Sequence, residues 1–206
     1  LPIIQTLQDL VRTGDHIYKI EGIFSGTLSY LFNSYDGSEP FSEIVKQAKE
    51  LGYTEPDPRD DLNGMDVARK LVILAREMGL GLEVEDVDVQ GLVPDELNDL
   101  DIPTFLERLP SLDEAMQQRI EAANKAGEIL RFVGSVNADG EARVALENYP
   151  ATHPFGRIQL TDNIVQFTSG RYKDNPLVVQ GPGAGPAVTA GGVFADILHL
   201  ARYLGA

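Results

Sequence analysis

One short stretch of the chain, residues 53–70, places several carboxylates shortly before a lysine. It reads YTEPDPRDDLNGMDVARK and ends on Lys70. A group of carboxylates can hold a small cationic ligand, and it also sets the proton affinity of a lysine beside it. The residues therefore suit the binding of an amine and the transfer of a proton. The acidic members are Glu55, Asp57, Asp60, Asp61 and Asp66.

Helical spacing brings two of these residues together. Asp66 and Lys70 are four positions apart, so on a helix they share one face. Apolar residues at helical intervals predict that the opposite side is buried. Pro56 and Pro58 precede the helix, and we expect them to keep the approach extended and stiff. The apolar stripe consists of Leu62, Met65, Leu71, Leu74, Ala75 and Met78.

The same residues also suit roles other than amine binding, and these alternatives stay open. Acidic residues are favoured at helix starts by the helix dipole. An exposed Asp–Lys pair at this spacing is common and contributes only about 0.3–0.5 kcal/mol. Carboxylate oxygens also bind Mg²⁺ or Ca²⁺, although the regular ligand spacing of an EF-hand is missing. The prolines favour a functional site, since a solvated turn does not need such stiffness.

Composition limits the classes of protein to consider. The chain has 206 residues, 43% hydrophobic and 24% charged, as in ordinary globular domains. Its net charge of −15 argues against nucleic acid or an anionic membrane as a partner. It has no cysteine, and its three histidines, His16, His153 and His199, lack metal-ligand spacing. Because it starts at Leu1 inside an apparent helix, we expect a piece of a longer protein.

Periodicity and turn signals predict alternating helices and strands. A hairpin is expected at NADG, residues 137–140, and acidic residues 95–101 are expected to form a loop. These elements predict one α+β domain over residues 1–206, with a mixed sheet and helices packed mainly on one face. We expect helices at 1–13, from a Ser25 cap, from a Ser42 cap to Gly52, up to about Met78, from a Ser111–Glu114 capping box to about Ala126, and at 193–204. We expect strands at 16–22, 86–94, 129–136, 141–149, 163–170 and 176–180.

Three segments resemble a known family. GIFSGTLSYLFN at 22–33, GYTEPDPRDDLNGMDVARK at 52–70 and GPGAGPAVTAGGVFADI at 181–197 are similar to the catalytic domain of homoserine dehydrogenase, most of all in bifunctional aspartokinase–homoserine dehydrogenases. The resemblance implies interconversion of L-homoserine and L-aspartate 4-semialdehyde with NAD(P), on the route to threonine, methionine and isoleucine. It also implies a homodimer or higher assembly, cytoplasmic in bacteria or in the plastid in plants.

The resemblance also implies roles for particular residues. Lys70 corresponds to the acid/base residue, and Asp61 lies beside the substrate in the catalytic set. The substrate-binding residues would be Glu55, Asp66, Tyr53, Gly26 and Thr27, although Tyr53 also suits simple packing. The cofactor-binding residues would be Gly185, Gly183 and Ser25, and a plain helix cap accounts for Ser25 equally well.

The family's nucleotide-binding domain has no counterpart in this sequence. No G-x-G-x-x-G follows a first strand, and the family's monovalent-cation segment would lie before Leu1. We therefore expect a substrate-binding and dimerisation domain that is inactive alone, with most of the NAD(P) contacts in the missing domain. The alternative is a non-catalytic oligomerisation or effector-binding module that retains this fold.

Overall fold

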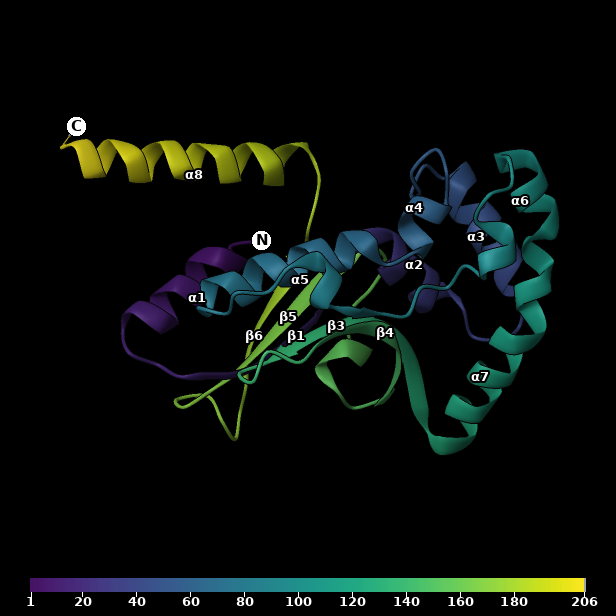
Figure 1. Ribbon diagram of the computed structural model, residues 1–206, viewed down its shortest axis with the longest axis horizontal. Helices are drawn as coiled ribbons and strands as arrows, with labels where there is room; N and C mark the ends of the chain where they lie inside the picture. Colours follow the sequence, from purple (N-terminus) through teal and green to yellow (C-terminus); the bar gives the residue numbers. More distant parts are fainter. Residues whose placement is uncertain (206) are drawn as a thin grey trace.

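A six-stranded sheet forms the centre of the molecule, in a computed structural model that describes residues 1–205 (Figure 1). The strand order is β2-β4-β3-β1-β5-β6. β2 pairs with β4 in parallel, and every other neighbouring pair is antiparallel. The predicted mixed α+β sheet is confirmed. The strands are β1 (Ile17–Ile23), β2 (Asp88–Val89), β3 (Glu128–Asn137), β4 (Ala142–Pro150), β5 (Asp162–Ser169) and β6 (Leu177–Pro182).

Most helices pack on one face of this sheet or at one of its ends. Figure 1 shows α1 and α5 over the sheet, α3, α6 and α7 grouped at one end, and α8 standing apart from the body. None of the helices in residues 1–205 is both long and apolar enough to cross a membrane. The helices are α1 (Ile3–Arg12), α2 (Gly26–Ser34), α3 (Phe41–Glu50), α4 (Arg59–Leu62), α5 (Met65–Glu77), α6 (Ile102–Arg108), α7 (Asp113–Ala126) and α8 (Pro186–Leu204), with 3₁₀ turns at 84–86, 95–97, 109–112 and 154–156.

The main core lies between the sheet and its helices. Successive strand side chains point to opposite faces, so Leu130, Phe132 and Val136 of β3 face the helices. A smaller apolar cluster on the other face includes Val133 and is covered by Phe155 of the 154–156 turn. The α5 prediction holds in outline: Leu71, Leu74 and Ala75 are buried, whereas Met65 and Met78 are only partly buried.

Local signals at two turns are confirmed. The Ser25 side chain caps α2 by accepting a hydrogen bond from the N–H of Leu28 at 3.2 Å. The NADG hairpin joins β3 to β4, and Gly140 there has a φ of +87°. Both features depend on residues adjacent in sequence, which is why the sequence predicts them.

Two predicted helix caps are wrong. Pro40, not Ser42, precedes α3, and the buried Ser42 hydroxyl donates instead to Asp113 at 2.7 Å. The Ser111–Glu114 capping box is absent, since α7 begins at Asp113 without a side-chain cap.

Three further elements differ from the prediction. The strand expected at 86–94 is only β2, two residues long. Helix α6 was not predicted; Asp101 caps it by accepting from the N–H of Thr104 at 2.9 Å, and a proline lies in its first turn. The last helix begins at Pro186 rather than at Val193, so the glycine-rich segment is partly helical.

The acidic stretch contains α4 and the start of α5, so two helices form where one was predicted. Between α4 and α5, Gly64 has a φ of +75°, which side-chain-bearing residues rarely adopt. A Cβ added there would lie 3.0 Å from Cζ of Phe132 and 3.3 Å from Cγ1 of Val144. The break places Asp61 on α4 and Asp66 on α5. Gly64, between the two helices, lies against Phe132 of β3 and Val144 of β4.

Gly64→Ala should lower the free energy of unfolding by about 2–3 kcal/mol, because backbone strain and overpacking each cost about 1–3 kcal/mol. Gly79→Ala is the matched control: Gly79 has a φ of +93° with no atom within 4 Å of an added Cβ. The control should lose only about 1 kcal/mol, from strain alone. Urea unfolding of both variants measures the difference, and equal losses would contradict the packing argument.

Candidate active site

The candidate site is built around the end of β1 and the start of α2, residues 23–27, which we call the β1–α2 junction. The carbonyl oxygen of Ile23 accepts a hydrogen bond from Nδ2 of Asn163 at 3.0 Å. The next carbonyl, that of Phe24, accepts from Nζ of Lys70 at 2.8 Å. Backbone acceptors need partners, and here side chains from distant elements supply them.

Lys70 is also paired with Asp66. Its Nζ lies 2.7 Å from Oδ2 of Asp66, on the face of α5 that points away from the core. The Lys70 and Asp66 side chains are 46% and 53% exposed, so the prediction that they share an accessible face is confirmed. An exposed pair adds little stability. Its effect is to hold the ammonium of Lys70 between a carboxylate and the Phe24 carbonyl.

Thr27 links the junction to the acidic stretch. Its Oγ1 lies 2.8 Å from Oδ1 of Asp61 and 2.6 Å from the carbonyl oxygen of Tyr53. The other carboxylate oxygen of Asp61 accepts from the N–H of Glu55 at 2.8 Å. Because a hydroxyl has one proton, Thr27 can donate to only one of its two acceptors at a time.

Asp61 is the carboxylate of the site whose ionisation is disfavoured. Burial raises the pKa of Asp61, and the nearby charges of Glu55 and Asp60 raise it further, while hydrogen bonds from the Glu55 N–H and from Thr27 oppose the rise. A protonated Asp61 could donate to Thr27, leaving the Thr27 proton for the carbonyl of Tyr53.

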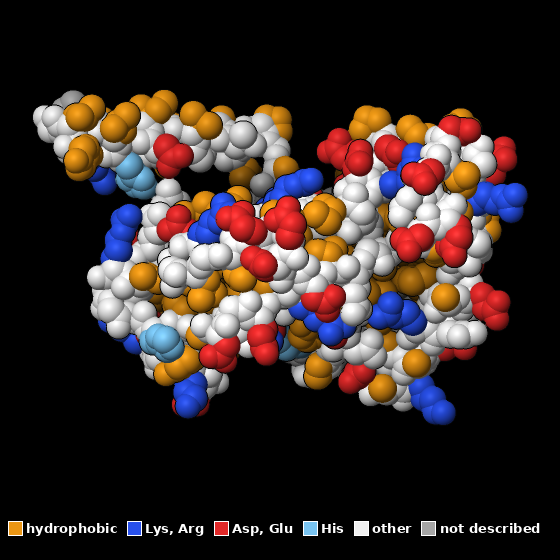
Figure 2. Space-filling view, in the orientation of Figure 1, with side chains coloured by type: hydrophobic (Ala, Val, Ile, Leu, Met, Phe, Trp, Pro, Cys, Tyr) orange, Lys and Arg blue, Asp and Glu red, His pale blue; other side chains and the backbone are white. Residues whose placement is uncertain are grey.

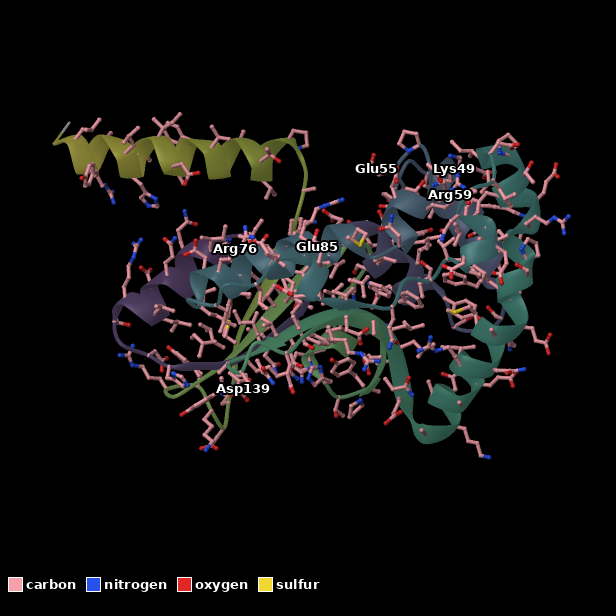
Figure 3. The ribbon with its side chains drawn as sticks, in the orientation of Figure 1. Lys49, Glu55, Arg59, Arg76, Glu85 and Asp139 are labelled. Carbon is pink, nitrogen blue, oxygen red and sulfur yellow. The ribbon has the colours of Figure 1, made fainter. Side chains whose placement is uncertain are left out.

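Glu55 and Tyr53 lie at the accessible side of the site. Glu55 is exposed, and within residues 1–205 no side chain forms a hydrogen bond or ion pair with its carboxylate. Figure 3 shows it at the outer edge of the segment before α4. Tyr53 is 40% exposed, and its ring centroid lies 4.7 Å from that of Tyr30. Tyr53 therefore packs on one side and is open on the other.

The stiff acidic approach is only partly as predicted. Asp57 is not free for a ligand, because its two oxygens accept from the guanidinium of Arg59, which lowers the pKa of Asp57. Pro58 has helical backbone angles, φ −60° and ψ −18°, and precedes α4 directly. Only Pro56 lies in the non-helical part of the approach.

The predicted glycines border a second segment, residues 161–163. A Cβ on Gly183 would lie 2.1 Å from Oδ1 of Asn163, so any other residue there would displace the Asn163 amide. A Cβ on Gly26 would lie 3.3 Å from the carbonyl oxygen of Thr161. Gly185 precedes α8 with nothing within 4 Å of an added Cβ, so it is open to a ligand. Ser25 is buried and its hydroxyl serves the α2 cap.

Asn163 and Thr161 are site residues that sequence reasoning missed. Asn163 is 8% exposed and joins the β1–α2 junction to Gly183. An asparagine at the start of an apolar strand was the available signal, and its partners lie far away in sequence.

The histidines lie outside this arrangement. Nδ1 of His153 accepts from the N–H of Phe155 at 3.3 Å, and burial lowers the pKa of His153. Across residues 1–205 there is no group of three or more His, Cys, Asp or Glu side chains placed to hold a metal ion.

A comparison with protein families matches residues 2–198 to the model for homoserine dehydrogenase. The chain belongs to the homoserine dehydrogenase family. The bifunctional aspartokinase/homoserine dehydrogenase 1 of Zea mays, a chloroplastic protein, is 55% identical over all of this chain and 23% of its own length. The homoserine dehydrogenase of Emericella nidulans is 51% identical over 99% of this chain and 59% of its own length.

A solved structure shows the same fold. The crystal structure of a Candida auris protein of unknown function has a TM-score of 0.93 and 47% identity, covering 98% of this chain and 58% of that one. This homoserine dehydrogenase-family chain thus spans about a quarter to three-fifths of the proteins that it matches.

Asp61→Asn should gain stability relative to the wild type as the pH rises. The raised pKa of Asp61 stabilises the folded state below the unfolded value of 3.8, and this contribution is lost as the pH rises through the folded pKa. The asparagine keeps an acceptor for Glu55 and a donor for Thr27 at every pH. Unfolding free energies measured from below pH 3.8 to neutral pH provide the check.

Asp57→Asn is the control with the opposite sign. Arg59 lowers the pKa of Asp57, so the wild type gains stability as the pH rises and the variant does not. The same pH trend in both variants would contradict the assignment of Asp61 as the disfavoured carboxylate.

Proposed function

We propose that this chain supplies the substrate-binding and proton-transfer groups of an enzyme that interconverts L-homoserine and L-aspartate 4-semialdehyde with NAD(P). The observation that carries this proposal is the position of Lys70, whose Nζ is held by Asp66 and the Phe24 carbonyl at the β1–α2 junction. Membership in the homoserine dehydrogenase family supports the reaction. The bifunctional relatives support a role in amino-acid biosynthesis, and the chloroplastic Zea mays relative fits a location in the plastid if the protein is from a plant. For a bacterial protein we propose the cytoplasm.

Carboxylates would hold the ammonium group of homoserine. Glu55 is exposed and without a side-chain partner in the described residues, so its charge is available. Asp66 and Asp61 approach the same junction through Lys70 and Thr27. Charge-assisted hydrogen bonds of this kind are short and stronger than neutral ones. Tyr53 and Thr27 would line the site, with Gly26 leaving room beside them.

Oxidation of homoserine removes a proton from the hydroxyl oxygen and a hydride from its carbon. Lys70 would accept the proton at Nζ as the general base and so become an ammonium, while Asp66 holds the side chain in place. In the reverse direction the same ammonium would return the proton to the aldehyde oxygen. Phe24 directs Nζ through its carbonyl, so the proton-transfer group keeps one orientation in both directions.

NAD(P) supplies the hydride acceptor or donor when it is bound. The residues here suit contact with one part of it: Gly185 is open, and the N–H groups that begin α8 favour an anionic group. Gly183 and Ser25 would contribute through their backbone, since neither has a free side chain. The larger share of the contacts falls to the nucleotide-binding part of the same protein, which would also hold any monovalent cation.

Helix α8 indicates where that part docks. Figure 2 shows hydrophobic side chains along α8, and none of its residues is buried. Contiguous exposed apolar surface usually marks an interaction site. We propose that the nucleotide-binding part covers α8 and that the whole protein is a homodimer or higher oligomer. The most exposed apolar residues of α8 are Val193, Phe194, Ile197, Leu200, Tyr203 and Leu204.

Lys70→Ala in the full-length protein should reduce kcat for homoserine by about 10²–10⁴-fold, the usual contribution of a general acid or base. Lys70→Arg should not restore it, because a guanidinium stays protonated. Glu55→Gln and Asp66→Asn should mainly raise the KM for homoserine, since they remove contacts shared by ground and transition states. Steady-state kinetics in both directions measures these effects.

Asp60→Asn serves as the control, because Asp60 is exposed on α4 and forms no ion pair in the described residues. It should leave kcat and KM close to wild type. Normal turnover by Lys70→Ala with loss in Asp60→Asn would instead indicate a carboxylate-bound metal. Calorimetry distinguishes a non-catalytic effector module, which would bind homoserine equally well after Asp66→Asn.

The isolated chain of residues 1–206 should form no NAD(P)H from homoserine above background. Orientation of the reacting groups supplies much of an enzyme's rate, and most of the cofactor contacts lie elsewhere. The full-length protein measured beside it should be active. Steady turnover by the isolated chain would show that the cofactor is held mainly by these residues.

A further inference from the structure

One side chain, Arg59, joins the acidic stretch to a distant loop. Its Nε lies 3.0 Å from Oδ1 of Asp57, and its Nη2 lies 2.7 Å from Oδ2. Its Nη1 donates to the carbonyl oxygens of Leu97, Asn98 and Leu100 at 3.1, 2.7 and 2.6 Å. We call this set of contacts the Arg59 bridge.

The guanidinium is also packed against an aromatic ring. Its Cζ lies 5.1 Å from the centroid of the Phe105 ring, and Phe105 is completely buried. The Arg59 side chain is only 15% exposed. These contacts need a planar cation with several donors in fixed directions, and the ammonium of lysine has neither property.

The bridge lies between two proposed substrate contacts. Asp57 follows Glu55 by two residues, and Arg59 precedes Asp61 by two. Helix α4 has four residues, too few to be stable without outside contacts. Two other hydrogen bonds hold the segment: the N–H of Glu55 donates to the Asp61 carboxylate, and the ammonium of Lys49 donates to the Pro56 carbonyl.

We infer that Arg59 is a positioning residue for homoserine: by fixing Asp57 against the 95–100 loop, the Arg59 bridge sets the spacing of Glu55 and Asp61. This inference rests on the proposed function. Arg59 contacts Asp57 and backbone carbonyls, so it acts on the substrate through the carboxylates on either side. Its loss should therefore weaken homoserine binding more than it slows the chemical step.

The test uses the full-length protein with Arg59→Gln, Arg59→Lys, Asp57→Asn and the Asp57→Asn/Arg59→Gln double variant. We expect the KM for homoserine to rise about 10-fold or more, because misplaced Glu55 and Asp61 would lose charge-assisted hydrogen bonds that ground and transition states share. The kcat should change by less than about 3-fold, and the KM for NAD(P) should stay the same. The double variant should be no worse than the poorer single one, since both remove one interaction.

Arg76→Gln is the matched control. Arg76 on α5 makes a similar bridge, from Nε to the Leu82 carbonyl at 3.1 Å and from Nη2 to Glu83 at 2.5 Å, but away from the acidic stretch. It should keep the wild-type KM for homoserine. Thermal unfolding is recorded for every variant, since a purely structural role would lower the melting temperature without separating the two KM values.

Each outcome decides the inference. A folded Arg59→Gln or Arg59→Lys protein with a wild-type KM for homoserine overturns it, as does an equal rise in both KM values. If Arg59→Gln does not fold, the KM values of Arg59→Lys and Asp57→Asn decide in the same way. A wild-type protein that does not oxidise homoserine overturns the proposed function itself, before any variant is compared.

Discussion

The site depends on two backbone carbonyls at the end of β1, those of Ile23 and Phe24. Within β1, the ladders to β3 and β5 pair the backbone as far as Gly22 and Ile23. At this end of β1 the Ile23 carbonyl accepts a hydrogen bond from the Asn163 side chain, and the Phe24 carbonyl, one residue beyond the strand, accepts from Lys70. The need to satisfy a strand end thus determines where the ammonium of Lys70 lies. The same junction presents Thr27 to Asp61.

Four of the five carboxylates of the acidic stretch have different surroundings. Arg59 neutralises Asp57, Lys70 pairs with Asp66, and partial burial disfavours the ionised form of Asp61. Glu55 remains exposed and free of side-chain partners in the described residues. Crowded like charges repel one another, so a fold can keep them only by such separate arrangements. The charge left available is directed to the accessible side, where an ammonium can reach it.

Short-range features of the site could be predicted from the sequence, and long-range ones could not. The Asp66–Lys70 pair and the Ser25 cap connect residues three or four apart, and both appear as expected. Arg59 reaches carbonyls 38 to 41 residues away, and Asn163 reaches Ile23 across 140. Sequence spacing contains no information about such partners. The break at Gly64 had a local signal, the Asn-Gly pair, but the close approach of Phe132 on β3 to Gly64 had none.

A site that binds an ammonium must keep negative charges close without neutralising all of them. A cation placed among Glu55, Asp61 and Asp66 would compete with the substrate, and without any cation the segment would be pushed apart. In the structure, Arg59 pairs with Asp57 rather than with one of these three carboxylates, and its other guanidinium nitrogen donates to uncharged backbone carbonyls such as that of Asn98. Lys70, which pairs with Asp66, is the residue that exchanges a proton with homoserine in the proposed reaction. Rigidity and charge are thereby supplied by different residues, which is why a single stretch can provide both.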